Sequence, residues 1–211
     1  MAMSTRGIAR HFLGRTGALS LRQVVGGGVS LRNRLENAAR QNISFAVSEC
    51  VYGWTAAYEQ TWSHVRVRIQ LNPDAGVTTL ANLQTTWATT IAQRWSNRWA
   101  IGRPGEAQCP LTFEVQFGAA NPHHAVRVRT GPARSNMTLW DDSDTGDVAA
   151  HEFGHMLGNP DEYTDTSCPV RNPVNSGTVM DNNSNTVPQR LVTRFATEVG
   201  SNIVAITGTG L

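Results

Sequence analysis

The segment from His151 to Asp161 combines side chains that together could bind a metal ion and use it. His151 and His155 are four positions apart, so on an α-helix both imidazoles face the same side and can reach one ion. Zinc favours imidazole nitrogen and also accepts carboxylate oxygen. Glu152 lies at the rim of that face, where it can hold a metal-bound water rather than the metal. The spacing therefore predicts a hydrolytic zinc site in which Glu152 is the general base.

The flanking residues predict how the helix begins and ends. Asp147 offers an acidic N-cap before good helix formers, and Gly158 offers a left-handed C-terminal break. Asn159-Pro160 prevents the helix from resuming. The reversed chain is expected to bring Asp161 beneath the histidines as a third ligand. Three protein ligands with an open fourth position are typical of catalytic zinc, whereas structural sites usually have four. A chance motif on a surface helix is the alternative, and Gly158 and Asp161 argue against it.

These residues resemble the metzincin clan of zinc endopeptidases, whose pattern is His-Glu-x-x-His-x-x-Gly-x-x-His followed by a methionine turn. Asp161 stands where most of the clan has histidine, which is similar to the snapalysin type of small bacterial proteases. The segment 176–181 resembles the methionine turn, and Met180 matches the methionine that packs beneath the metal. The resemblance implies one catalytic Zn²⁺, a protein or peptide substrate, and an α+β zincin fold. That fold has a mixed twisted sheet, a long backing helix, an active-site helix and a small irregular C-terminal lobe.

The chain also departs from the clan. Several metzincins carry a tyrosine two positions after the turn methionine, where it assists at the metal, and this sequence has Asn182 there. Tyr163 follows the zinc segment closely and is interpreted as an ordinary packed tyrosine. A carboxylate ligand such as Asp161 adds negative charge at the metal, which should moderate its Lewis acidity relative to a third imidazole.

Hydrophobic periodicity predicts the elements that would position the site. Alternating residues predict strands at 65–71, 111–117 and 125–129, with a short fourth strand at 137–140. A long helix is expected over about 78–100, and a last helix over about 188–200. The apolar stripe of the long helix is Leu80, Leu83, Trp87, Ile91, Trp95 and Trp99, interpreted as core. By analogy with the clan, the strand nearest the cleft binds extended substrate, and the candidate residues are Asn136, Met137, Thr138, Leu139 and Trp140. A plain edge strand is the alternative.

Two polar segments are weighed as further ligand sites. Asp141–Asp147 contains four carboxylates, but their spacing does not match an EF-hand loop. A solvated loop before a helix N-terminus is therefore favoured over a Ca²⁺ site. His123-His124 follows a proline, lacks an obvious ligand partner and is interpreted as surface.

Composition bounds the class of protein. The 211 residues carry a formal net charge of +2, and every basic residue is arginine. This charge argues against nucleic-acid binding, and no apolar run approaches the length that spans a membrane. A monomer is expected. Three cysteines, Cys50, Cys109 and Cys168, leave the pairing open, and Cys168 is also weighed as a fourth metal ligand in a latent form.

We expect a basic N-terminal arm at 1–41, serving as tag, prosegment or tail, and a catalytic domain at 42–211. The catalytic domain would have an upper lobe at about 42–158 and a lower lobe at about 159–211. The arm does not resemble a classical signal peptide. We therefore expect a bacterial protein exported by a non-classical route, or otherwise a cytoplasmic one.

The favoured function is a zinc endopeptidase acting as an exported effector or toxin. Absence of lysine, the ubiquitin acceptor, would fit survival in a eukaryotic cytosol, but a GC-rich genome that favours arginine codons is the simpler explanation. The alternatives are a non-enzymatic zinc-stabilised binding module and a latent protease inhibited by its arm.

Overall fold

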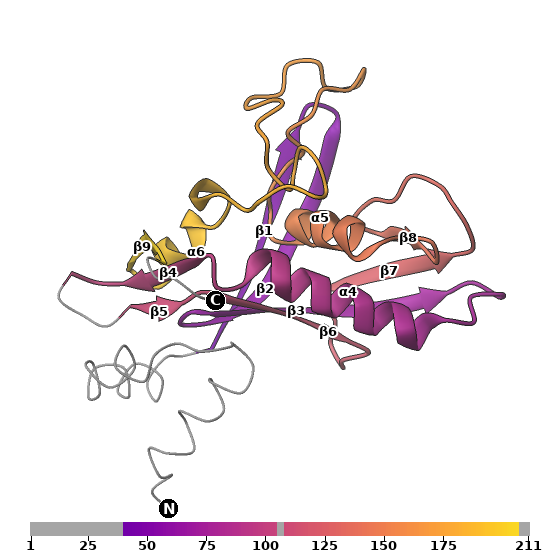
Figure 1. Ribbon diagram of the computed structural model, residues 1–211, viewed down its shortest axis with the longest axis horizontal. Coiled ribbons are helices and arrows are strands. Elements are labelled where there is room, and N and C mark those ends of the chain that lie inside the picture. Colours follow the sequence, from indigo (N-terminus) through magenta and orange to yellow (C-terminus); the bar gives the residue numbers. More distant parts are fainter. Residues whose placement is uncertain (1–39, 105–107, 207–211) are drawn as a thin grey trace, which may run out of the picture.

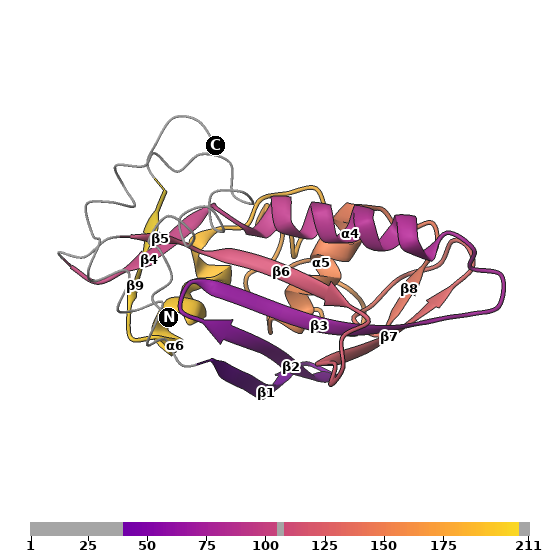
Figure 2. The same ribbon diagram turned by 90° about the horizontal axis from the view of Figure 1, so that it is seen from below.

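The computed structural model describes residues 40–104 and 108–206 (Figure 1). Its main body is a mixed six-stranded sheet with the order β1-β2-β3-β7-β8, in which β6 also pairs with β3. Two helices, α4 (Leu80–Trp95) and α5 (Gly146–Met156), lie on one side of this sheet and pack against each other (Figure 2). A small antiparallel sheet, β5-β4-β9, forms a separate unit. This arrangement confirms the predicted α+β fold of the zincin type.

The strands of the main sheet combine a hairpin with parallel pairs. Their bounds are β1 (Gln41–Glu49), β2 (Tyr52–Thr61), β3 (His64–Pro73), β6 (Thr112–Phe117), β7 (His124–Arg129) and β8 (Leu139–Asp141). The antiparallel pairs are β1 with β2 and β2 with β3, whereas β3 pairs in parallel with β6 and β7, and β7 with β8. The strands predicted at 65–71, 111–117 and 125–129 are confirmed. The fourth is shorter than predicted, because Asn136 instead closes a turn onto Leu139.

The β1–β2 hairpin is not among the predicted elements. Its first strand does alternate, since Ile43, Phe45 and Val47 are part-buried between exposed neighbours, but no residue of β1 is fully buried. The buried positions of β2 include the small Ala56. Figure 1 shows the hairpin extending past α5, with its tip beside the loop that follows that helix. A hairpin that was not predicted therefore reaches the region of the predicted metal site (Figure 1).

Helix α4 supplies the apolar stripe that was expected, but it ends earlier than 100. Trp87, Ile91 and Trp95 are buried, which confirms that these tryptophans belong to the core. The helix stops at Trp95 because Ser96 is extended and Asn97 takes a left-handed φ of 61°. Trp99 lies instead in β4 (Trp99–Gly102), which pairs with β5 (Cys109–Pro110) and β9 (Asn202–Ala205).

The predicted C-terminal helix over 188–200 is divided. A 3₁₀ turn, η1 (Gln189–Leu191), precedes a short α6 (Thr193–Glu198), because Val192 between them has φ −123° and ψ 0°. Among the described residues, no helix is long and apolar enough to cross a bilayer. The expected N-terminal arm at 1–41 lies outside the described residues up to position 39, so it stays a prediction.

Candidate active site

Helix α5 carries the histidine pair, and its start differs from the prediction. The N-cap is Thr145, whose side chain accepts a hydrogen bond from the Val148 backbone N–H. Asp147 instead lies in the first turn, where its Oδ1 is 2.7 Å from Arg94 Nη2. The predicted end is confirmed, since the helix stops at Met156 and Gly158 has φ +92°. The chain can therefore turn back toward the helix immediately after its last turn.

Three tryptophan side chains fix this helix and the loop before it. Trp95 Nε1 donates to the Ala150 carbonyl at 2.9 Å, and Trp87 Nε1 donates to the Asp144 carbonyl at 3.0 Å. From the hairpin, Trp54 Nε1 donates to the His155 carbonyl at 2.9 Å, and its ring meets the His155 ring edge to face. Helix α4 and strand β2 therefore hold both ends of α5 by directional bonds.

The structure brings His151, His155 and Asp161 together. Asp161 Oδ1 lies 3.0 Å from His151 Nε2 and 3.1 Å from His155 Nε2, and the candidate ligand atoms lie within 4.8 Å of one another. Each Nδ1 faces a carbonyl oxygen at 2.8 Å, that of Val179 for His151 and that of Asn159 for His155. Because a carbonyl only accepts, each Nδ1 carries a hydrogen, so Nε2 is the nitrogen that can coordinate a metal once it gives up any proton that it shares with Asp161.

The charge of Asp161 suits a ligand. Burial alone would raise the pKa of its carboxyl, but hydrogen bonds and charge from His151 and His155 lower that pKa well below its usual range. The carboxylate is therefore ionised at neutral pH. Two imidazoles and one carboxylate make up a donor set that suits zinc and leaves a coordination position for water.

Glu152 lies next to these ligands without bonding to them. It is buried, and its Oε2 has no hydrogen-bond partner among the residues that the structure describes. Burial raises the pKa of this carboxyl, while the charges of His155 and His151 oppose the rise. A buried carboxylate oxygen without a partner is costly unless another group completes the site. A metal-bound water would do so, and the residues present therefore fit a zinc site.

A methionine packs against the histidine helix at Gly154. Met180 is fully buried, and a Cβ added at Gly154 would lie 2.4 Å from its sulfur. The Met180 carbonyl also accepts from the Glu162 N–H at 2.8 Å, next to Asp161. This short segment therefore supports the histidine helix and the returning chain together.

Comparison with known proteins agrees with this geometry. Residues 105–198 match the family model of the immune inhibitor A peptidase M6 catalytic domain, and the match covers His151 to Met180. The protein is a zinc metalloendopeptidase. Its substrates are proteins or peptides. Neither a curated protein nor a solved structure gives a significant match to the chain.

Tyr163 lies against His151, one of the candidate ligands. The sequence had suggested only an ordinary packed tyrosine. Its ring stacks on His151 with centroids 6.4 Å apart, and its hydroxyl accepts from Arg134 Nη2 at 2.6 Å. Burial and the charge of Asp161 raise the pKa of Tyr163 to about 12, so it stays protonated. By contrast, Asn182 is exposed and bonds to Ser184 within its own turn.

Other sequence interpretations change in the structure. Asp141 is buried and accepts hydrogen bonds from backbone N–H groups of Ser143 and Ala133, so this acid is part of a tight loop rather than a solvated one. Among the described residues, the cluster that could hold a metal ion is that of His151, His155 and Asp161. His124 is buried and its Nε2 meets the Ala57 carbonyl, so its interpretation as surface was wrong.

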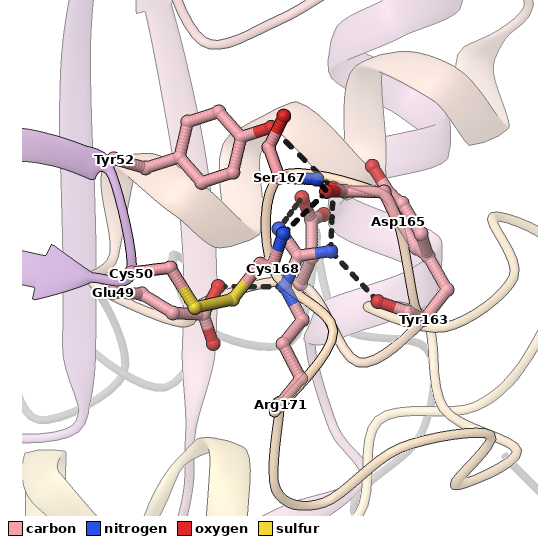
Figure 3. The surroundings of a disulfide bond; sticks show 9 residues. Glu49, Cys50, Tyr52, Tyr163, Asp165, Ser167, Cys168 and Arg171 are labelled. Carbon is pink, nitrogen blue, oxygen red and sulfur yellow. Dashed lines mark hydrogen bonds and ion pairs between the residues drawn. A yellow bond between two sulfur atoms is a disulfide. The ribbon is translucent and has the colours of Figure 1, made fainter.

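The cysteine pairing left open by the sequence is also resolved. Cys50 and Cys168 form a disulfide, and Cys109 is a buried thiol. Cys168 is therefore not a metal ligand here. The bridge joins the tip of the β1–β2 hairpin to the loop after the zinc segment (Figure 3).

Proposed function

We propose that the enzyme cleaves peptide bonds at a zinc ion held by His151, His155 and Asp161, with Glu152 as general base. The observation that carries this proposal is the buried Glu152 Oε2, which lacks a partner among the described residues beside a ready set of ligands. Asp161 as third ligand and Met180 as floor would make this a metzincin-type site of the aspartate variant.

When bound, zinc would polarise the scissile carbonyl and lower the pKa of its water to about 7. Glu152 would then accept a proton from the attacking water and donate it to the leaving amine. Its buried position keeps the carboxylate from being hydrated, and its raised pKa strengthens it as a base. The Tyr163 side chain bonds to Asp161, and its oxygen accepts from Arg134. Tyr163 is proposed to redirect its phenolic hydrogen to the developing oxyanion.

Substrate is proposed to bind in extended form beside the candidate stretch Asn136–Trp140, along its extended part at Leu139 and Trp140, since Asn136 to Leu139 form a turn. Strand β8 terminates the order of the main sheet, and the chain from it leads directly into α5. An extended peptide can add to such an edge through main-chain hydrogen bonds. Trp140 is fully buried and makes no direct contact with substrate in this scheme, whereas Asn136 and Thr138 are exposed.

The enzyme is further proposed to act outside the bacterial cytosol, as an exported effector or toxin. The Cys50–Cys168 disulfide supports export, because such bonds persist in oxidising compartments. Recovery of active enzyme from culture fluid rather than from cell lysate would agree with this proposal, and the reverse distribution would contradict it.

The decisive experiment compares Glu152→Ala with wild type. The variant should bind one zinc per chain, as measured by metal analysis, yet lose cleavage of casein and of a peptide library by at least about a hundredfold. Glu198→Ala, which changes a glutamate in α6, is the matched control and should stay active. Full activity in Glu152→Ala would refute the role of Glu152.

Tyr163→Phe tests the proposed role of Tyr163 as a hydrogen-bond donor to the oxyanion. It removes the hydroxyl but keeps the ring, so kcat should fall while zinc content and KM change little. An unchanged kcat would remove Tyr163 from the mechanism.

Should the zinc-loaded wild type be inactive, a chain lacking residues 1–39 tests whether the arm holds the enzyme in a latent state.

A further inference from the structure

A buried arginine lies behind the candidate metal ligands. The Arg171 side chain is 1% exposed and comes from the loop that follows the zinc segment (Figure 3). Its Nε donates to Glu49 Oε2 at 2.8 Å, and its Nη1 donates to Asp165 Oδ2 at 2.8 Å and to the Tyr163 carbonyl at 2.7 Å. Its Nη2 donates to Asp161 Oδ2 at 3.3 Å. One guanidinium therefore bonds to three carboxylates and a backbone oxygen.

The two oxygens of the Asp161 carboxylate have different partners. Oδ1 faces both histidine Nε2 atoms at 3.0 and 3.1 Å, whereas Oδ2 faces Arg171. A carboxylate without a partner on its second oxygen can rotate and offer both oxygens to a metal. Here the second oxygen is already bonded, so one oxygen is left to the ion.

We propose that Arg171 is a positioning residue that makes Asp161 a one-oxygen zinc ligand and offsets its negative charge. This inference rests on the proposed zinc site. A carboxylate in place of a third imidazole would by itself weaken the metal as a Lewis acid. A hydrogen-bonded cation on the far oxygen withdraws part of that charge from the metal, as partners behind metal ligands commonly do.

The environment of Arg171 holds the guanidinium in this orientation. The ring of Tyr163 lies 5.1 Å from the central carbon of the guanidinium, and the ring of Tyr52 lies 5.6 Å from it. Tyr163 belongs to the loop that follows the zinc segment, called the ligand loop below, and Tyr52 belongs to the β1–β2 hairpin. A planar group with donors in a rigid fork can satisfy several carboxylates at once, which a lysine ammonium cannot do. The number and direction of its bonds therefore require arginine.

The β1–β2 hairpin provides the other anchor. Glu49, the last residue of β1, accepts from Arg171, and the adjacent Cys50 is bonded to Cys168 of the ligand loop. Tyr52, the first residue of β2, bonds to Asp165 through its hydroxyl at 3.5 Å. Residues far upstream of the zinc segment thus fix the arginine that orients its third ligand.

The test is zinc affinity, measured on the full chain by competition with a chromophoric chelator. Arg171→Met keeps the length of the side chain but removes its donors, and we expect the zinc Kd to rise by about 10- to 100-fold. Arg171→Lys should fall between wild type and Arg171→Met. The control is Arg190→Met. It breaks the ion pair between Arg190 of η1 and Glu162 of the ligand loop and removes no bond to Asp161. Its Kd should stay within about twofold of wild type.

A second measurement separates positioning from plain stabilisation. The visible spectrum of the cobalt(II)-loaded protein reports ligand geometry, so it should change in Arg171→Met and not in Arg190→Met. An unchanged Kd and spectrum in Arg171→Met, whatever its melting temperature, would overturn the proposal. If that variant does not fold, Glu49→Gln takes its place with the same two measurements, and wild-type values there would overturn the proposal equally.

Failure of the Arg171 proposal can be told apart from failure of the proposed zinc site and of the Glu152 mechanism. Zinc and cobalt binding are measured without substrate, so loss of the Glu152 mechanism would leave them unchanged. A wild-type chain that binds no zinc would refute the site itself, whereas an active Arg171→Met variant with the wild-type zinc Kd and cobalt spectrum would refute only the role of Arg171.

Discussion

Opening the Cys50–Cys168 bridge should cost a large part of the folding stability. The perturbation is the double variant Cys50→Ser with Cys168→Ser, which cannot cross-link the hairpin tip to the ligand loop. The bridge spans a sequence separation of 118 residues. In the chain-entropy description, a cross-link that closes a loop of this length destabilises the unfolded state by about 5 kcal/mol at 25 °C. Native bridges deliver about 2–5 kcal/mol in practice, so we expect a loss within that range.

The assay is unfolding in urea and by heat, with and without reductant. For a domain of this size, each kcal/mol shifts the melting temperature by about 2–4 °C, so a fall of about 4–20 °C is expected. Reductant should lower the stability of the wild type to that of the double variant. It should leave the stability of the double variant unchanged, because Cys109 is the remaining cysteine and is a thiol. A double variant within about 1 kcal/mol of wild type would refute the reasoning. So would an equal effect of reductant on both proteins.

Three further outcomes are expected. Gly154→Ala would place a Cβ 2.4 Å from Met180 Sδ and 2.9 Å from Trp95, so it should lower stability in thermal unfolding by about 1–3 kcal/mol. The control Gly53→Ala, whose Cβ meets nothing closer than 3.8 Å, should cost less, and equal losses would contradict the steric account. The hydrogen bond with His64 lowers the pKa of Glu114 from 4.5 to about 2 against the opposing effect of burial. Its stabilising effect is therefore present above pH 4.5 and lost as pH falls toward 2, so the stability gap between wild type and Glu114→Gln should close over that range in acid titrations of unfolding. A gap independent of pH would contradict this assignment. Chelating zinc should lower stability by about 2.7 kcal/mol relative to protein with free zinc at a hundred times Kd. His155→Ala should show no such difference, and a persisting difference would place the zinc elsewhere.

Much of the metal site could be predicted because its parts are close in sequence. The spacing of His151 and His155 is a property of the helix, and the turn at Gly158 is a property of glycine, so both could be inferred without a tertiary structure. The strands at 65–71 and 125–129 were also predictable, since one of their faces is buried and the pattern alternates.

Predictions were wrong where packing overrides a local pattern. By spacing alone, the apolar stripe of the long helix continues to Trp99. In the structure the left-handed Asn97 follows the end of the helix, and Trp99 lies in β4 of the second sheet. His124 looked polar enough for the surface, yet it alternates with core residues in β7 and satisfies its ring nitrogen at Ala57.

The sequence by itself determined the local arrangement of the zinc segment: which side chains can face one ion, where the helix ends, and which carboxylate returns to the two histidines. Only the tertiary structure decided what surrounds those ligands. Arg171 and Tyr163 lie on an irregular loop with no periodicity, and Glu49 and Trp54 lie on a hairpin about a hundred residues upstream. Contacts between such distant segments depend on how the whole chain packs and on a bridge between two of three cysteines, and local residue order does not specify either.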